Sequence, residues 1–240
     1  GFDGIEEGYA MLDPIKVTIL TPGIRPGGGM EDRGIPAGIV TKYLRKSGIV
    51  VEKTGYYSFL VLFTLGITKG KSGTLLAELF RFKALYDQNS PLEEVFPDLV
   101  RQYPTRYSGR GLADLCQEMH GYLREKSIAD LVRRVYAMLP EPVMTPAEAY
   151  RRLVRGEVTA VPVSELEGRT VAAMVVPYPP GIPVIMPGER CGPATRAVVD
   201  YLVSLEEFDS LFPGFESEVH GADVVAGDGR RVYYIYCVTQ

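Results

Sequence analysis

The stretch Gly48-Ile-Val-Val-Glu-Lys-Thr-Gly55 places one carboxylate, Glu52, directly after three β-branched residues. β-Branched residues favour strands, so the pattern predicts a short buried strand over residues 49–51 that ends at a charged turn. A carboxylate at the end of a buried strand is costly unless a cation meets it. Glu52 is therefore either half of an ordinary ion pair, with Lys53 or a nearby arginine, or a carboxylate that receives a cationic ligand.

The residues on both sides of this stretch predict alternating strands and helices, which indicates a small α+β domain. The predicted elements are strands over 16–20 and 57–63, a helix that Pro36 opens and Ser47-Gly48 closes, and an amphipathic helix over 71–86. The stretch 88–104 has three prolines and few periodic residues. We therefore predict a domain boundary there.

The second half of the chain again mixes helices and strands. Its predicted elements are helices over 112–124, 128–138 and 194–205 and strands over 158–163, 170–176 and 232–238. A further helix is predicted to begin at Thr145-Pro-Ala-Glu148, which combines an N-cap threonine, proline at the first helical position and glutamate at the third.

A second proline- and glycine-rich region carries two more candidate site residues. Tyr178 lies in Pro177-Tyr-Pro-Pro-Gly181, where the flanking prolines restrict the backbone and aim the phenol in one direction. The ring either packs under a turn or lines a binding site. Glu189, in Met186-Pro-Gly-Glu189, either faces a ligand or belongs to a first helical turn, where a carboxylate is favoured.

Composition excludes several classes of function. The net charge of −4 argues against nucleic acid as a partner, and no apolar run reaches the roughly 20 residues of a membrane helix. Cys116, Cys191 and Cys237 are widely spaced, which argues against a zinc site and indicates a reducing cytoplasm. His120 and His220 are predicted to be ordinary helix-surface or loop residues, with no catalytic or metal-binding role.

Several motifs, taken together and in order, resemble the carboxyl-terminal third of the bacterial ornithine/lysine/arginine decarboxylases. These enzymes are fold-type-I proteins that use pyridoxal phosphate. The motifs are Asp13-Pro-Ile-Lys-Val-Thr18, Thr21-Pro-Gly23, Gly34-Ile-Pro-Ala37, Val40-Thr-Lys-Tyr-Leu44, the stretches 48–55 and 177–189, Phe212-Pro-Gly-Phe-Glu216 and His220-Gly221.

The resemblance implies an α/β (α+β) fold, with an aminotransferase-like small subdomain over residues 1–89 and an α+β carboxyl-terminal domain over residues 90–240. It implies that Glu52 receives the distal cationic group of a basic amino acid and that Tyr178 faces the mouth of the active site. Glu189 is the third candidate for substrate binding. The implied reaction is decarboxylation of arginine or lysine, and less readily of ornithine. It yields CO2 and a polyamine, and it serves acid resistance and polyamine supply.

The family holds pyridoxal phosphate on a lysine of a Ser-x-His-Lys sequence, and no His-Lys pair occurs here. The resemblance therefore implies a large cofactor domain before Gly1, no catalytic residue in this chain, and no activity of the chain alone. It also implies a homodimer with its active site at the subunit interface, often assembled into a ring of five dimers. The alternative is a non-catalytic binding or assembly module that keeps the decarboxylase carboxyl-terminal fold.

Overall fold

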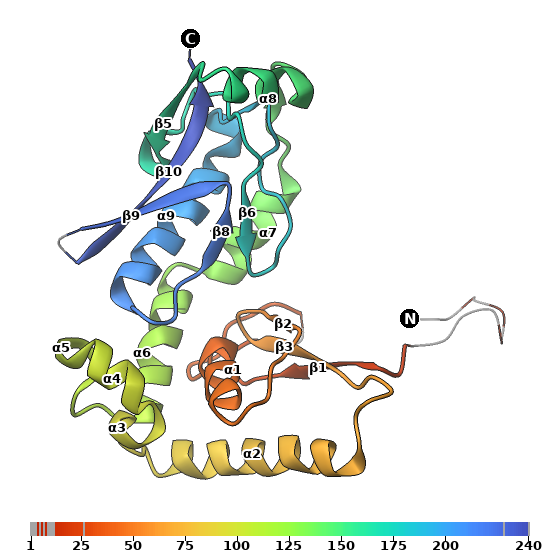
Figure 1. The fold of residues 1–240 in the computed structure, drawn as a ribbon, viewed down its shortest axis with the longest axis vertical. Coiled ribbons are helices and arrows are strands. Elements are labelled where there is room, and N and C mark those ends of the chain that lie inside the picture. The colour runs from red at the N-terminus through yellow and green to blue at the C-terminus, as the bar shows by residue number, and fades with distance from the viewer. Residues whose placement is uncertain are drawn as a thin grey trace.

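The computed structural model describes residues 4, 6, 8, 13–25, 27–227 and 229–239. These residues form an N-terminal lobe (13–111) and a C-terminal lobe (128–239), which are joined by the helix α6 (Leu112–Glu125). Figure 1 shows the N-terminal lobe below, the C-terminal lobe above, and α6 rising between them. The site described below lies where the lobes meet.

The N-terminal lobe is built on a small antiparallel sheet of strand order β1-β3-β2, in which Val17 lies opposite Val61. Its elements are β1 (Lys16–Leu20), α1 (Ala37–Lys46), β2 (Lys53–Thr54), β3 (Ser58–Leu62), α2 (Lys69–Asp87), α3 (Leu92–Val95), α4 (Pro97–Gln102) and α5 (Pro104–Tyr107). The strand predicted over residues 49–51 is wrong. Those residues are irregular, Val50 is 73% exposed, and the paired strand begins one residue after Glu52.

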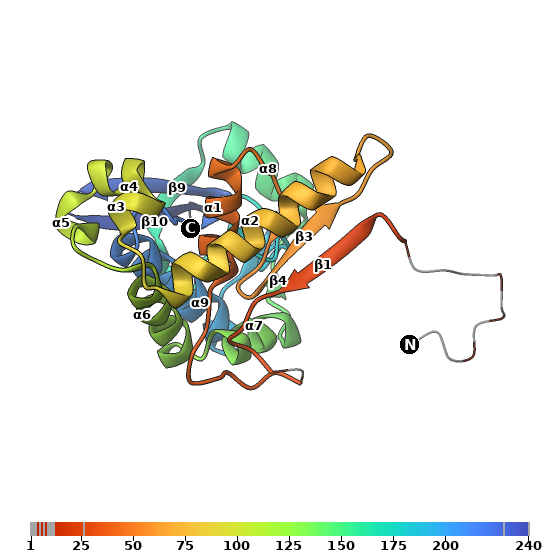
Figure 2. The same ribbon diagram turned by 90° about the horizontal axis from the view of Figure 1, so that it is seen from below.

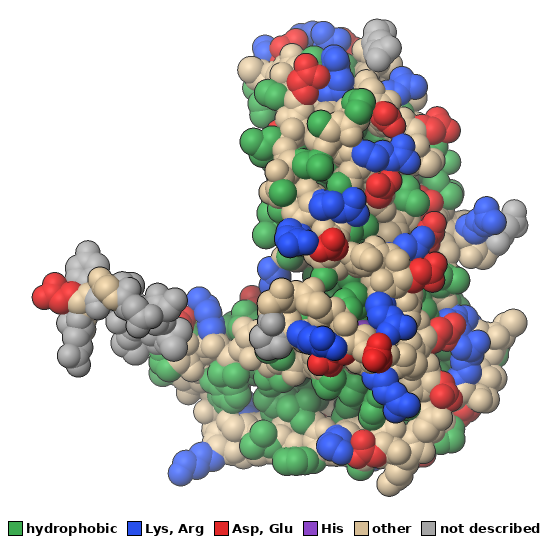
Figure 3. Space-filling view, turned by 180° about the vertical axis from the view of Figure 1, so that it is seen from behind, with side chains coloured by type: hydrophobic (Ala, Val, Ile, Leu, Met, Phe, Trp, Pro, Cys, Tyr) green, Lys and Arg blue, Asp and Glu red, His purple; other side chains and the backbone are tan. Residues whose placement is uncertain are grey.

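The long helix α2 crosses the lobe beside α1 and the sheet, as seen from below in Figure 2. Its Phe82 contacts Tyr43 of α1, with ring centroids 5.4 Å apart, and Leu75 is also buried. The helix was predicted correctly, but its apolar face is only partly covered. Leu76 and Phe80 are 58% and 72% exposed, and Figure 3 shows hydrophobic side chains gathered on the back of this lobe.

The stretch 88–104, in which the domain boundary is predicted, is regularly folded. It folds into α3 and α4, and Leu92, Phe96 and Leu99 are buried in the same hydrophobic cluster as α1 and α6. Two of its prolines stand at the first positions of α4 and α5, where a proline without N–H is tolerated. The domain boundary at residues 89 and 90 stays a prediction.

The C-terminal lobe packs helices against a second antiparallel sheet of strand order β5-β10-β9. Its elements are α7 (Ile128–Ala137), β4 (Glu141–Pro142), α8 (Pro146–Val154), β5 (Val158–Pro162), η1 (Val163–Glu165), β6 (Val176–Tyr178), β7 (Glu189–Arg190), η2 (Pro193–Thr195), α9 (Arg196–Leu211), β8 (Glu218–His220), β9 (Ala222–Gly227) and β10 (Arg230–Val238). Both α7 and β10 contact α9, whose Tyr201 and Leu202 are fully buried.

Most helices of this lobe agree with the sequence predictions, including the N-cap of α8, where the Thr145 hydroxyl accepts the Glu148 N–H. The continuous strand predicted over 170–176 is wrong. That stretch forms isolated bridges, Val171 with Cys237 and Val175 with Ile185, before β6 begins at Val176. Its apolar residues are buried by contacts with several elements, and a periodic pattern alone does not reveal this.

His120 is also different from the prediction, because its side chain is completely buried under the Gly34 loop. Its Nε2 lies 2.9 Å from the Glu31 carbonyl oxygen, to which it must donate. Nδ1 therefore accepts the hydroxyl proton of Tyr57, at 2.6 Å. His120 thus ties α6 to the loop before α1 and to the start of β3.

Some features of the described residues bear on function classes. No helix in the described ranges is both long enough and apolar enough to cross a membrane. No group of three or more histidine, cysteine or acidic side chains in that part of the chain is arranged to hold a metal. Cys116, Cys191 and Cys237 are buried free thiols, and burial raises the pKa of Cys237 to about 11.

We predict that His120→Leu lowers the free energy of unfolding by roughly 2–3 kcal/mol, because Tyr57 and the Glu31 carbonyl lose their buried partner. Urea unfolding measures this. Gln117→Ala is the matched control, since Gln117 lies on the same helix and donates to the Asp32 carbonyl of the same loop at an exposed site. A loss for His120→Leu no larger than that of the control would contradict the assignment.

Candidate functional site

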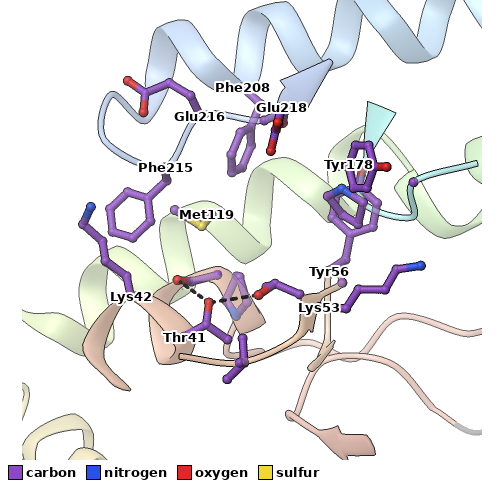
Figure 4. Close-up of a pocket in the computed structure, with 18 of the residues that line it drawn as sticks. Thr41, Lys42, Lys53, Tyr56, Met119, Tyr178, Phe208, Phe215, Glu216 and Glu218 are labelled. Atoms are coloured by element: carbon purple, nitrogen blue, oxygen red, sulfur yellow. Dashed lines mark hydrogen bonds between the residues drawn. The ribbon is translucent and has the colours of Figure 1, made fainter. Parts of the chain in front are cut away.

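A cavity of about 790 Å³ lies between the two lobes. Its N-terminal wall comes from α1 and residues 51–56, its floor from Met119 and Leu123 of α6, and its C-terminal wall from residues 178–181 and 214–218. Figure 4 shows Lys42 and Phe215 at one end and Tyr56 and Tyr178 at the other. The volume lies within the range of small-molecule sites.

Glu52 lies in the N-terminal wall, on the bend that leads into β2. Its backbone N–H donates to the Leu60 carbonyl oxygen at 2.9 Å, which fixes the bend against β3. The side chain is exposed, and none of the ion pairs formed by the described residues includes it. Of the two interpretations of Glu52, the ion pair with Lys53 or an arginine does not form among the described residues, and Glu52 is one of the residues that line the cavity.

Tyr178 lies in the opposite wall, at the end of β6, where it pairs with Glu218 of β8. Its ring is 41% exposed and packs against the His220 ring, with centroids 4.9 Å apart. On the other side it covers Gly181, which has φ of +78°. His220 in turn contacts the Glu218 carboxylate at 2.6 Å. Tyr178 therefore packs over a turn, as one interpretation expected, and also lines the pocket.

Residues 213–218 complete the C-terminal wall and are held by side chains of both lobes. Lys42 of α1 donates to the Gly214 carbonyl oxygen at 2.9 Å, and its ammonium lies 5.2 Å from the centre of the Phe215 ring. From the other side, Arg231 pairs with Glu216 at 2.7 Å, and Asp209 accepts the Ser217 N–H at 2.8 Å. The segment is therefore fixed in place.

The electrostatics of the pocket are mixed. Its walls carry the carboxylates of Glu52, Glu216 and Glu218 and the cations of Lys42 and Arg45. Burial lowers the pKa of Lys42, while the nearby Glu216 opposes the shift. Glu52 and Arg45 make no ion pair among the described residues, so a ligand with a cationic and an anionic group, such as an amino acid, would find a partner for each charge in these two.

Glu189 lies outside this pocket. It belongs to β7, which pairs with β4, and its carboxylate accepts the Met186 N–H at 2.7 Å. The structure thus brings Glu52 and Tyr178 to one cavity and places Glu189 elsewhere. A role of Glu189 in substrate binding stays a prediction.

Sequence reasoning missed several residues of the pocket, among them Lys42, Tyr56 and Glu216. Tyr56 had the clearest signal, because it follows the Glu52 stretch directly, in the bend between β2 and β3. Tyr57 turns to His120, and Tyr56 reaches Tyr201 at 3.0 Å. Lys42 and Glu216 stand in motifs that resemble the family, but those motifs do not show that the two residues share a pocket, since their proximity depends on how the lobes meet.

Comparison with known proteins identifies the group to which this site belongs. The family profile described as Orn/Lys/Arg decarboxylase, major domain, matches residues 1–71, and the profile of its C-terminal domain matches residues 129–239. The chain belongs to the Orn/Lys/Arg decarboxylase family. The family that its motifs resembled is therefore confirmed, and so is the mixed helix and sheet fold.

Individual relatives match nearly the whole length of this chain. Lysine decarboxylase LdcA of Pseudomonas aeruginosa is 52% identical over 240 residues, which are all of this chain and 32% of that protein. The biodegradative arginine decarboxylase of Escherichia coli is 42% identical over 99% of this chain and 31% of its own length. The solved structure of the E. coli constitutive lysine decarboxylase superposes with a TM-score of 0.89 at 43% identity, over 95% of this chain and 32% of its own.

The chain thus spans about a third of the length of the decarboxylases that it matches. The two profiles match different walls of the pocket: residues 1–71 include Glu52, and residues 129–239 include Tyr178. In this family member, the pocket is therefore assembled from both matched regions.

The buried Asp209 gives the segment 213–218 a dependence on pH. Burial raises the pKa of the Asp209 carboxyl to about 6, although hydrogen bonds from Ser217 and Tyr233 oppose the shift. Because the folded pKa lies above the unfolded value of about 3.9, the stabilising contribution is complete below about pH 4 and is lost as pH rises through about 6. From pH 4 to pH 7, the free energy of unfolding of the wild type, measured with urea, should fall by about 2 kcal/mol more than that of Asp209→Asn.

Asp130→Asn is the control for this pH series, since Asp130 is exposed and pairs with Arg133 on the surface of α7. The control should keep the pH dependence of the wild type. An Asp209→Asn variant that also keeps it would contradict the assignment of that dependence to Asp209.

Gly181→Ala should displace the Tyr178 ring, because an added Cβ would lie 2.5 Å from its Cε1 atom. Gly156→Ala is the matched control, with a φ of +74° and no atom near the added Cβ. Both changes should cost about 1 kcal/mol of backbone strain. The NMR shifts of the His220 ring, which stacks on Tyr178, should change in Gly181→Ala alone. Unchanged His220 shifts would show that the ring tolerates the methyl group.

Proposed function

We propose that this chain is the carboxyl-terminal part of a pyridoxal-phosphate-dependent decarboxylase of basic amino acids, with lysine as its substrate. The observation that carries the proposal is the pocket in which the unpaired Glu52 faces the same space as Tyr178. Among the relatives, a lysine decarboxylase has 52% identity, an arginine decarboxylase 42% and an ornithine decarboxylase 37%, which supports lysine.

Glu52 is proposed to bind the distal cation of the substrate. Its backbone is fixed by Leu60, while its carboxylate has no cationic partner among the described side chains. A charge-assisted hydrogen bond to an ammonium group is among the stronger polar contacts. The exposure of Glu52 in this chain implies that its desolvation comes from the bound substrate and from protein beyond these 240 residues.

Tyr178 is proposed to line the mouth of the substrate site. Its phenol has both donor and acceptor capacity, and its ring is fixed between His220 and Gly181. Such a fixed aromatic group orients a flexible aliphatic substrate without losing conformational entropy of its own.

Pyridoxal phosphate would supply an electron sink for loss of the α-carboxylate. The residues of this pocket do not fit as its anchor. Lys42 already donates to Gly214 and faces Glu216, so its ammonium is engaged, and Lys53 is exposed on β2. We therefore propose that the cofactor is held by a part of the major domain that this chain does not include, and that the chain alone is inactive.

The partners follow from the same proposal. Exposed apolar side chains in the N-terminal lobe, such as Leu20, Leu76 and Phe80, are suited to contact with the rest of the major domain or with a second subunit. A homodimer, further assembled into a larger ring, would be consistent with this surface. The buried free thiols support a reducing cytoplasm as the location.

The test is decarboxylation of lysine, arginine and ornithine by the full-length protein and its Glu52→Gln variant, with the isolated chain as the negative control. For lysine, Glu52→Gln should lower kcat/KM about 100-fold, because the neutral amide no longer compensates the ammonium charge. The content of bound cofactor and the melting temperature should stay unchanged, since Glu52 makes no ion pair within the described chain.

Glu165→Gln is the control, because Glu165 is an exposed carboxylate of η1 away from the pocket. It should keep the kcat/KM of the wild type. Equal kcat/KM for Glu52→Gln and the wild type would refute the role of Glu52. A full-length protein that binds no cofactor and decarboxylates none of the three amino acids would instead favour the non-catalytic assembly module.

A further inference from the structure

A buried hydroxyl group connects the two walls of the pocket. Tyr201 of α9 is completely buried, and its hydroxyl donates to the Pro179 carbonyl oxygen at 2.9 Å. The same hydroxyl lies 3.0 Å from that of Tyr56. Tyr201 itself does not line the cavity, whereas Tyr56 and Pro179 do.

The directions of these two bonds follow from the donors available. A carbonyl oxygen accepts only, so Tyr201 must use its single proton for Pro179. The Tyr56 hydroxyl must then donate to the Tyr201 oxygen. The chain of bonds runs from Tyr56 through Tyr201 to Pro179, and it leaves none of the three groups unpaired.

Each end of this series of hydrogen bonds lies next to a residue of the proposed substrate site. Tyr56 follows the bend that carries Glu52, and its carbonyl oxygen accepts the Ala37 N–H at the start of α1 at 2.8 Å. Pro179 follows Tyr178 directly. Tyr56 and Pro179 are 123 positions apart in sequence, and the buried hydroxyl of Tyr201 fixes the separation between the two segments that contain them.

The turn at 178–182 is also held at other points, so that it moves as one unit. The Gly181 N–H donates to the Pro177 carbonyl oxygen at 2.8 Å, and Tyr136 donates to the carbonyl oxygen of Ile182 at 3.0 Å. These bonds lie within the C-terminal lobe, whereas the bond between Tyr201 and Tyr56 crosses to the other lobe. Loss of the Tyr201 hydroxyl would therefore change the distance between the walls more than the shape of the turn.

We infer that Tyr201 is a positioning residue, which sets the placement of Tyr178 relative to Glu52 without touching the substrate. The inference rests on the proposed function, because the two aligned residues are those proposed to bind the amino acid. Small displacements of binding groups are costly for catalysis, since a shift of about 1 Å can lower a rate by roughly 100-fold.

The experiment measures the decarboxylation of lysine by the full-length protein with Tyr201→Phe, Tyr178→Phe and the double variant. Tyr201→Phe should lower kcat/KM about tenfold while the content of bound cofactor stays that of the wild type. If Tyr201 acts through Tyr178, its substitution should have little further effect in the Tyr178→Phe background. A purely structural role would instead give the same factor in both backgrounds.

Tyr43→Phe is the matched control, since Tyr43 is a buried tyrosine that loses one side-chain hydrogen bond, to Glu78 at 2.8 Å, and is not among the residues that line the pocket. It should lower the melting temperature and leave kcat/KM unchanged. If Tyr201→Phe does not fold, Tyr56→Phe replaces it in the same comparison of single and double variants. This variant removes the hydrogen bond between Tyr56 and Tyr201 and should lower kcat/KM about threefold. As with Tyr201→Phe, it should have little further effect in the Tyr178→Phe background.

The outcomes separate the two proposals. Suppose that the wild type is active and that Tyr201→Phe, or Tyr56→Phe in its place, has the same kcat/KM as the control Tyr43→Phe. This result would overturn the positioning role but not the proposed function. Additive effects of Tyr201→Phe and Tyr178→Phe do the same. A full-length wild type without activity on lysine, arginine or ornithine overturns the proposed function, and the positioning role with it.

Discussion

The carboxyl-terminal end of α9 is the point on which the rest of the structure depends. The last carbonyl groups of a helix have no partner within it, and here the following turn does not supply all of them. Arg106 donates to the Leu211 carbonyl oxygen at 2.6 Å, Tyr107 to that of Pro213 at 2.8 Å and Lys42 to that of Gly214 at 2.9 Å. Leu211 is the last residue of α9, whereas Pro213 and Gly214 lie in the segment after it. All three donors belong to the N-terminal lobe, so that lobe holds both the end of α9 and the pocket wall that follows it.

Elements that are determined by residues close in sequence were predicted, and elements that depend on distant partners were not. Helices α1, α2 and α8 were predicted because caps and apolar spacing lie within the helix itself. The strands expected over 49–51 and 170–176 failed because β-branched and apolar residues there are placed by distant partners, such as Cys237 for Val171. His120 was misjudged for the same reason, since its partners lie 63 and 89 positions away.

The candidate site shows the same division. Glu52 and Tyr178 were identifiable because each stands in a short motif that resembles a family pattern. For Glu52, however, the pattern predicted the end of a buried strand, whereas the residue lies on an exposed bend. Tyr201 stands in no such motif, and Lys42 and Glu216 stand in motifs that do not reveal their roles, because these roles arise from the contact between the lobes. A sequence pattern does not specify that contact.

A pocket built from two lobes requires more constraint than one built on a single element, because each lobe can remain folded while the walls move apart. Three kinds of contact oppose that motion here. The helix α6 joins the lobes covalently, Lys42 and Tyr107 hold the segment after α9, and the hydroxyl of Tyr201 joins the two ends that carry Glu52 and Tyr178. The first two contacts hold one whole lobe against the other. The third acts beside the proposed substrate residues, so it governs geometry on the scale that recognition of an ammonium group requires.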